Sequence, residues 1–157
     1  MPCLKEKLLI VDDEASIRKS MSDVLAEMGF RVRSAEDGLS ALRELQEDVP
    51  DILLSDLNMP GMSGFELLLM VRRCFPTIQT IAMSGAFSGN EVPSGVAADG
   101  FYQKGSSFGA LLQIIATMPR VERRLPQSLN VLASLGTHRN EHSAFAETCV
   151  GPSAQSA

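Results

Sequence analysis

Five side chains that can bind a cation or a phosphoryl group stand at the ends of short apolar runs: Asp12, Asp13, Asp56, Ser84 and Lys104. Three carboxylates in one cleft repel one another, so they are costly unless a cation joins them. Oxygen ligands alone suit Mg²⁺ far better than zinc. A carboxylate beside Mg²⁺ and a lysine is poised to accept a phosphoryl group, because both cations offset charge on the transferring oxygens. A nearby hydroxyl can then hydrogen-bond the new phosphate, a contact present only in the modified state, which a switch requires.

The apolar pattern predicts strands that alternate with helices. Continuous or alternating apolar runs indicate strands at residues 8–11, 30–34, 52–54, 77–83 and 101–104. Apolar stripes at helical spacing indicate helices at residues 17–28, 39–45, 65–74 and 108–118. This alternation implies right-handed βαβ units and one parallel sheet with helices on both faces. Ligands of such sheets bind outside the carboxyl ends of the strands, so we expect the five side chains to converge at one edge.

Composition indicates an ordinary globular protein with no sign of a membrane span. The chain has 157 residues, is 45% hydrophobic and carries a net charge of -5. A strongly cationic protein that coats nucleic acid is therefore not expected. No apolar run approaches the roughly 18 residues that a membrane span needs, and residues 1–7 lack the apolar segment of a secretion signal. These observations predict a cytoplasmic protein, and its three cysteines, which are far apart, are interpreted as free thiols.

Four segments carry a resemblance to a known family: LLIVDDE at 8–14, LLSDLNMPG at 53–61, AMSG at 82–85 and YQK at 102–104. In this order they resemble the receiver domains of two-component response regulators, of the chemotaxis-regulator-like, single-domain type. The resemblance covers about residues 6–118. Each segment alone is weak, but the combination is highly specific.

The resemblance implies a role for each matching residue. Asp56 matches the phospho-accepting aspartate, and Asp12 and Asp13 match the acidic pair of the Mg²⁺ site. The metal would also be bound by Asp56 and by the backbone carbonyl of Asn58. Lys104 matches the lysine that pairs with the phosphoryl group. Ser84 matches the switch hydroxyl, and Phe101 matches the aromatic residue that changes its burial on phosphorylation.

The same resemblance implies a fold and partners. The fold is α/β, a doubly wound, flavodoxin-like (βα)5 arrangement with a five-stranded parallel sheet in the order 2-1-3-4-5. The implied phosphodonor is a sensor histidine kinase or a phosphotransfer protein, and the signal passes to a downstream protein partner or onward in a phosphorelay. Direct binding to DNA or membranes is not expected, and the resemblance is compatible with a homodimer. Self-phosphorylation and self-dephosphorylation are the expected side activities, so the chain is not expected to be an enzyme.

Two departures from the family pattern concern loops near the predicted site. Lys104 is followed by Gly105, where the family usually has a proline after a cis bond. A cis bond before a residue other than proline costs about 3–4 kcal/mol, so we expect a trans bond and a looser loop. Glycines and a proline also interrupt residues 85–100, so we expect this segment to be mobile or to depart from a regular fourth helix.

The sequence predicts a receiver domain over residues 1–118 and a tail over residues 119–157. The tail is interrupted by Pro119, Pro126 and Gly136, and it is too short for the usual DNA-binding output domain. We expect it to be mostly disordered. The alternative is one short amphipathic helix, indicated by Leu125, Leu129, Leu132 and Leu135.

Two other functions remain open at the level of sequence. An Mg²⁺-dependent aspartyl-phosphate phosphatase of the haloacid dehalogenase type also uses an aspartate after a strand. Such enzymes need a second acid two residues later, where this chain has Asn58. The second alternative is a pseudo-receiver, an interaction module that is not phosphorylated. The complete set of acids, hydroxyl and lysine argues against it.

Overall fold

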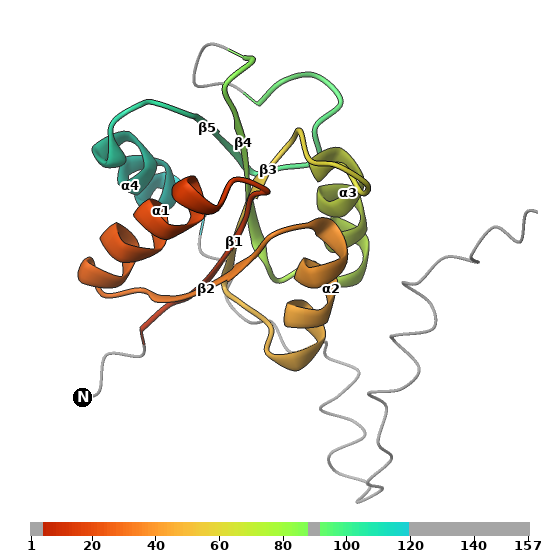
Figure 1. Cartoon of the computed structure of the whole chain (residues 1–157), viewed down its shortest axis with the longest axis horizontal. Helices are drawn as coiled ribbons and strands as arrows, with labels where there is room; N and C mark the ends of the chain where they lie inside the picture. The colour runs from red at the N-terminus through yellow and green to blue at the C-terminus, as the bar shows by residue number, and fades with distance from the viewer. Residues whose placement is uncertain (1–4, 88–91, 120–157) are drawn as a thin grey trace, which may run out of the picture. The chain divides into compact units, whose positions relative to one another are not determined.

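A computed structural model describes residues 5–87 and 92–119, in which strands and helices alternate along the chain (Figure 1). The strands are β1 (Lys7–Val11), β2 (Arg31–Ala35), β3 (Ile52–Asp56), β4 (Gln79–Ser84) and β5 (Gly100–Gln103). The helices are α1 (Ala15–Glu27), α2 (Gly38–Glu47), α3 (Gly64–Cys74) and α4 (Phe108–Thr117). The predicted elements are therefore all present, with ends that differ by a few residues at most.

The five strands form one parallel sheet in the order β2-β1-β3-β4-β5, which confirms the predicted fold class. β3 lies at the centre and every one of its residues is buried, as its continuous apolar run predicts. β2 lies at an edge and is the most exposed strand, in agreement with its alternating sequence.

Helices cover both faces of the sheet and divide the core into two clusters. α1 and α4 lie on one face, and α2 and α3 lie on the other (Figure 1). Met21 and Leu25 of α1 and Leu111 of α4 pack against one face of the sheet. Leu45 of α2 and Leu67 of α3 pack on the opposite face. The apolar stripes in the sequence therefore become the buried faces of the helices.

The connection between β4 and β5 contains no helix within its described residues, 85–87 and 92–99. This agrees with the predicted departure from a regular helix, and the described chain has four helices rather than the five of a (βα)5 arrangement. Val96 is buried in the α2–α3 side of the core, with Val92 and Ala98 partly buried beside it. Irregular chain, with a turn in which the Val96 amide binds the Pro93 carbonyl, thus covers part of the sheet where the family pattern implies a helix.

Three further observations bear on the sequence predictions. Cys74 is disulfide-bonded, so the interpretation of the cysteines as free thiols is wrong for this residue. No helix in the described ranges has the length and apolar character needed to cross a membrane. The predicted tail lies outside the described residues from position 120 onward, and the predicted boundary near residue 118 stays a prediction.

Gly64 allows α3 to begin close against the end of β3. A Cβ atom at this position would lie 1.9 Å from the carbonyl oxygen of Asp56. The Gly64 amide donates a hydrogen bond of 3.0 Å to the carbonyl of Leu57. α3 itself starts with a capping box, in which Ser63 and Glu66 exchange hydrogen bonds. The backbone around the strand end is therefore fixed by contacts that only glycine permits.

We predict that Gly64→Ala lowers the free energy of unfolding by about 1–3 kcal/mol or more, because overpacking forces the backbone to shift. The matched control is Gly109→Ala in α4, where an added Cβ would meet only the Ser107 hydroxyl, at 3.7 Å. There the substitution is expected to be neutral or stabilising by about 0.5–1 kcal/mol. Urea unfolding followed by circular dichroism measures both, and equal stabilities of the two variants would contradict the prediction.

Candidate functional site

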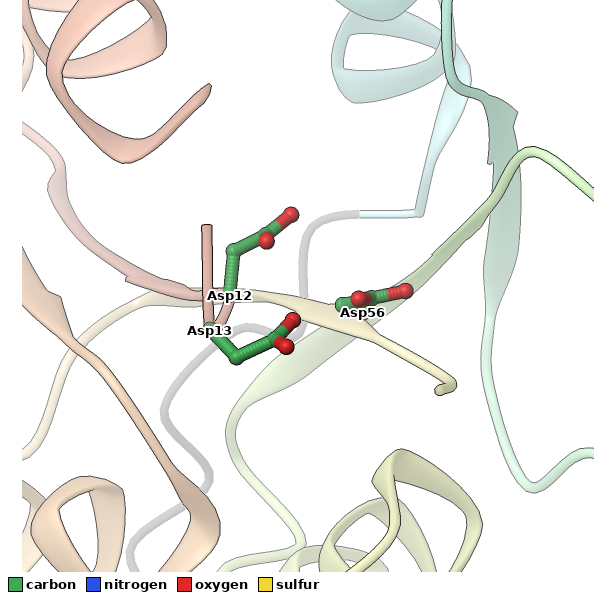
Figure 2. Close-up of side chains that lie close together, drawn as sticks. All are labelled: Asp12, Asp13 and Asp56. Carbon is green, nitrogen blue, oxygen red and sulfur yellow. The ribbon is translucent and has the colours of Figure 1, made fainter. Parts of the chain in front are cut away.

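Three carboxylates lie together at the carboxyl ends of β1 and β3 (Figure 2). Asp12 and Asp13 directly follow β1, and Asp56 is the last residue of β3. The two strands are neighbours in register, with Val11 opposite Ser55. One carboxylate oxygen from each aspartate lies within 4.8 Å of the others. Asp12 and Asp56 are buried while Asp13 is exposed, so the cluster opens to solvent on one side.

Lys104 completes the cluster as its cation. Its Nζ lies 2.7 Å from Oδ2 of Asp12 and 3.0 Å from Oδ2 of Asp56. Lys104 follows β5, and its amide donates a 3.0 Å hydrogen bond to the carbonyl of Ser84 at the end of β4. The parallel register of β3, β4 and β5 therefore brings the lysine to the carboxylates, as predicted from the sequence.

Asp12 is held by its backbone as well as by its side chain. Its Oδ1 accepts a 2.9 Å hydrogen bond from the amide of Glu14, and its carbonyl accepts one of 2.7 Å from Nη1 of Arg18. The sequence analysis missed this arginine. Its place beside Ile17, in the first turn of the predicted helix next to the acidic pair, is the signal that could have identified it.

The electrostatics of the site follow from burial and from the ion pairs. Burial raises the pKa of Asp56 above its ordinary value of 3.8, although Lys104 acts in the opposite direction. Burial alone would lower the pKa of Lys104, but its contacts with Asp12 and Asp56 outweigh burial and raise it above 10.5. Lys104 is thus held as a cation, while its contact with Asp56 only partly offsets the cost of burying the charge of that carboxylate.

Ser84 and Asn58 lie beside the carboxylates. Ser84 is fully buried, and its Oγ accepts a 3.1 Å hydrogen bond from the amide of Ala86 and a 3.5 Å contact from Nδ2 of Asn58. The amide of Asn58 donates to Oδ1 of Asp56 at 3.3 Å. The predicted switch hydroxyl is therefore linked to the predicted phosphoacceptor through Asn58. The metal-ligand role of the Asn58 carbonyl stays a prediction.

Phe101 lies apart from the polar cluster. It is 1% exposed and belongs to the core on the α2–α3 side of the sheet. It pairs with Ala82 of the neighbouring strand. The structure therefore places this predicted switch residue in its buried position, and the predicted change of burial stays a prediction.

The loop after Lys104 differs from the family pattern in its backbone. No cis peptide bond occurs in the described residues, and Gly105 has a φ of 91°. A proline ring holds φ at about -65° and cannot adopt this conformation. Glycine is therefore the residue that this loop requires, and it still delivers Lys104 to both carboxylates.

The acidic cluster fits Mg²⁺ by its chemistry. All available side-chain ligands are oxygens, which hard divalent cations prefer. Within the described residues, Oδ2 of Asp12 is buried and accepts no hydrogen bond of good geometry, although it forms the ion pair with Lys104. One lysine for three carboxylates leaves negative charge that a divalent cation can offset.

We predict that Asp56→Asn stabilises the metal-free protein at neutral pH. The pKa of Asp56 is raised on folding, so its ionised form destabilises the fold at pH values above the folded pKa. This penalty is absent below the unfolded value of 3.8, so the gain should shrink as the pH falls toward that value. Urea unfolding in EDTA across this pH range provides the measurement.

Asp23→Asn provides the control, because it removes an exposed carboxylate that pairs with Lys19 at 3.0 Å on α1. Such an exposed pair contributes about 0–1 kcal/mol, so this variant should not show the same rise in relative stability with pH. A wild-type protein that is as stable as Asp56→Asn at neutral pH would refute the electrostatic argument.

Comparison with known proteins agrees with this geometry. The family model "Response regulator receiver domain" matches residues 8–116. The probable transcriptional regulator ycf27 of Guillardia theta is 42% identical over 69 residues, which is 44% of this chain and 27% of that protein. The chain therefore matches only about a quarter of the length of this curated relative.

Among solved structures, the chain is similar to proteins that it covers over nearly their full length. Chemotaxis protein CheY4 of Vibrio cholerae is 30% identical with a TM-score of 0.65, over 73% of this chain and 99% of that one. Response regulator TrrA of Thermotoga maritima, in complex with Mg²⁺ and BeF, is 29% identical with a TM-score of 0.65, over 71% of this chain and 96% of that one. TrrA in complex with histidine kinase ThkA gives a TM-score of 0.64. With a parallel sheet in the order 2-1-3-4-5 and a family match over most of its length, the chain belongs to the response regulator receiver domains of two-component systems.

Proposed function

We propose that Asp56 accepts a phosphoryl group and that the resulting aspartyl phosphate switches the conformation of this domain. The observation that carries the proposal is the double ion pair of Lys104, at 2.7 Å from Asp12 and 3.0 Å from Asp56. This contact holds a cation beside the buried carboxylate of Asp56, whose two oxygens are contacted by Lys104 and by the amide of Asn58. Such preorganised charge favours phosphoryl transfer, which depends mainly on positioning and electrostatics.

In the proposed reaction, a carboxylate oxygen of Asp56 attacks the phosphorus of a phosphohistidine. An O–P bond forms, the N–P bond breaks, and the imidazole nitrogen leaves with the electron pair. The ammonium group of Lys104 is positioned to contact a phosphoryl oxygen, and the hydroxyl of Ser84 then donates a hydrogen bond to another. The last contact exists only in the phosphorylated state, so it provides the free-energy difference that a switch needs.

We assign Mg²⁺ binding to Asp12, Asp13 and Asp56, with the backbone carbonyl of Asn58 as a further ligand. The clustering of their carboxylate oxygens within 4.8 Å supports this assignment for the aspartates. When bound, the metal would offset negative charge on the phosphoryl oxygens during transfer. The TrrA structure was obtained with Mg²⁺ and BeF, which is consistent with the same chemistry in a similar protein.

The proposed phosphodonor is a histidine kinase or a phosphotransfer protein. A pocket of about 260 Å³ lies beside the site, and its lining comes from α1, from β5, from the loop that follows β5 and from the start of α4. Ile17, Met21 and Phe108 supply apolar surface, while Lys104 belongs to both the pocket and the acidic cluster. An apolar side chain of a donor protein can occupy this pocket while its phosphohistidine reaches Asp56.

A phosphatase function is less well supported. Phosphatases of the haloacid dehalogenase type need a second acid two residues after the nucleophile, to protonate the leaving group. Asn58 occupies that position, and its side chain contacts the Ser84 hydroxyl at 3.5 Å. An amide cannot serve as a general acid, so stable phosphorylation is favoured over turnover of organic phosphates.

We predict that acetyl phosphate with Mg²⁺ adds one phosphoryl group to the wild-type protein and none to Asp56→Asn. The substitution keeps the shape of the side chain but removes the nucleophile. Intact-protein mass spectrometry measures the adduct, and EDTA should abolish it. Labelling of Asp56→Asn would reject Asp56 as the acceptor, labelling in EDTA would reject the metal site, and an unlabelled wild type would favour a pseudo-receiver. Steady release of phosphate from p-nitrophenyl phosphate would favour a phosphatase.

A second prediction tests the donor-binding pocket separately from the chemistry. Ser20 is exposed and lines the pocket, so Ser20→Arg should obstruct it without disturbing the core. Transfer from a purified histidine kinase that labels the wild type should fall by about tenfold, as for an interface position of ordinary importance. Labelling by acetyl phosphate should be unchanged.

Ala26→Arg is the matched control, because it adds the same charge to an exposed position of α1 that does not line the pocket. It should leave both donors unaffected. An equal loss of kinase transfer in the two variants would attribute the effect to charge alone, and no loss in Ser20→Arg would place the donor elsewhere.

A further inference from the structure

An aromatic pair joins the loop after β4 to the core. The rings of Phe87 and Phe101 meet edge to face, with centroids 6.3 Å apart and an interplanar angle of 85°. Phe101 is 1% exposed, whereas Phe87 is 39% exposed. Edge-to-face pairs of this kind contribute beyond the area that they bury. Phe87 therefore shields Phe101 with one side of its ring and presents the other side to solvent.

Phe87 is coupled to the phosphorylation site through two residues of backbone. The amide of Ala86 donates a 3.1 Å hydrogen bond to Oγ of Ser84, so the switch hydroxyl fixes the start of this loop. Phe87 is the next residue. When Oγ moves toward a phosphoryl group on Asp56, the Ala86 amide must follow it or lose its hydrogen bond. In the first case residue 87 moves with the amide; in the second the loop loses the contact that fixes its start.

Phe101 has much less freedom to respond. It lies within β5, paired with Ala82, and it is buried in the same cluster as Val96. Moving its ring outward would empty a site in a packed core, which is costly because interiors contain few voids. Phe87 is the member of the pair with a solvent-exposed side, so its displacement uncovers less buried surface than that of Phe101.

We propose that Phe87 is a positioning residue of the switch, and that it is the aromatic side chain that moves when Asp56 is phosphorylated. In the unphosphorylated state Phe87 rests on Phe101 and holds the loop in the arrangement in which Ser84 binds the Ala86 amide. Phosphorylation draws Ser84 away, and Phe87 leaves Phe101. This inference rests on the proposed phosphorylation of Asp56 and adds a residue to it that the family pattern did not indicate.

Tryptophan fluorescence tests the movement directly, because the chain contains no tryptophan. In Phe87→Trp, the emission should shift to longer wavelength when Mg²⁺ and beryllofluoride are added, as the ring becomes more exposed. Phe30→Trp is the control, since Phe30 is a partly buried aromatic directly before β2, which forms the opposite edge of the sheet from β5. Its emission should stay constant. An unchanged or blue-shifted emission from Trp at position 87 overturns the inference.

The affinity for beryllofluoride gives a second readout. If Phe87 served only to stabilise the fold, its removal would not raise this affinity. Phe87→Ala removes a contact of the unphosphorylated state, so the affinity should rise by about two- to tenfold. Phe87→Tyr keeps the ring and should restore the wild-type affinity. Unchanged or weaker binding by Phe87→Ala overturns the inference. Absence of binding by the wild type would instead count against the proposed function, which keeps the two failures distinguishable.

Discussion

The ion pairs of Lys104 are the interaction on which the rest of the site depends. Two buried carboxylates and one exposed one are crowded at one edge of the sheet, and in a low-dielectric setting such a cluster is unstable without a cation. Lys104 supplies the cation in the absence of metal, and it reaches both Asp12 and Asp56. Removing Lys104 would leave two buried carboxylates without their cation, which costs far more than an ion pair itself contributes. Stability and phosphoacceptor chemistry therefore both require the cation of Lys104 beside these carboxylates.

The sheet places Lys104 beside the carboxylates, because parallel pairing aligns strand ends that are distant in sequence. Lys104 and Asp12 are 92 positions apart by their numbers, yet each directly follows a strand of the same sheet. Lys104 is held in position by the sheet, since β5 pairs with β4 and the Lys104 amide donates a hydrogen bond to the carbonyl of Ser84. The charged groups are thus placed by backbone hydrogen bonds, which favour low reorganisation during transfer.

Much of this arrangement could be predicted from the sequence, because the signals were local. A buried run followed by acids indicates a strand end, as at Asp12 and Asp56, and helical stripes indicate the covering faces. The contact between Arg18 and the Asp12 carbonyl could not be predicted in this way, since it depends on the angle at which α1 leaves the strand end. The contact between Phe87 and Phe101 joins a loop without periodicity to a strand. No pattern of spacing encodes such a tertiary contact, and the disulfide bonding of Cys74 was likewise missed.

The loop after β4 shows how a segment without regular structure bears on the proposed switch. A regular helix at that position would tie the loop into repeated backbone hydrogen bonds, and its movement would cost the free energy of the whole element. In the described residues the chain instead leaves β4 through the Ser84–Ala86 contact and a single aromatic pair. Each is a weak, separate interaction, so a modest gain at the phosphoryl group is enough to exchange them. In the proposed switch, a connection whose described residues form no helix is therefore easier to bias, because few contacts must be exchanged.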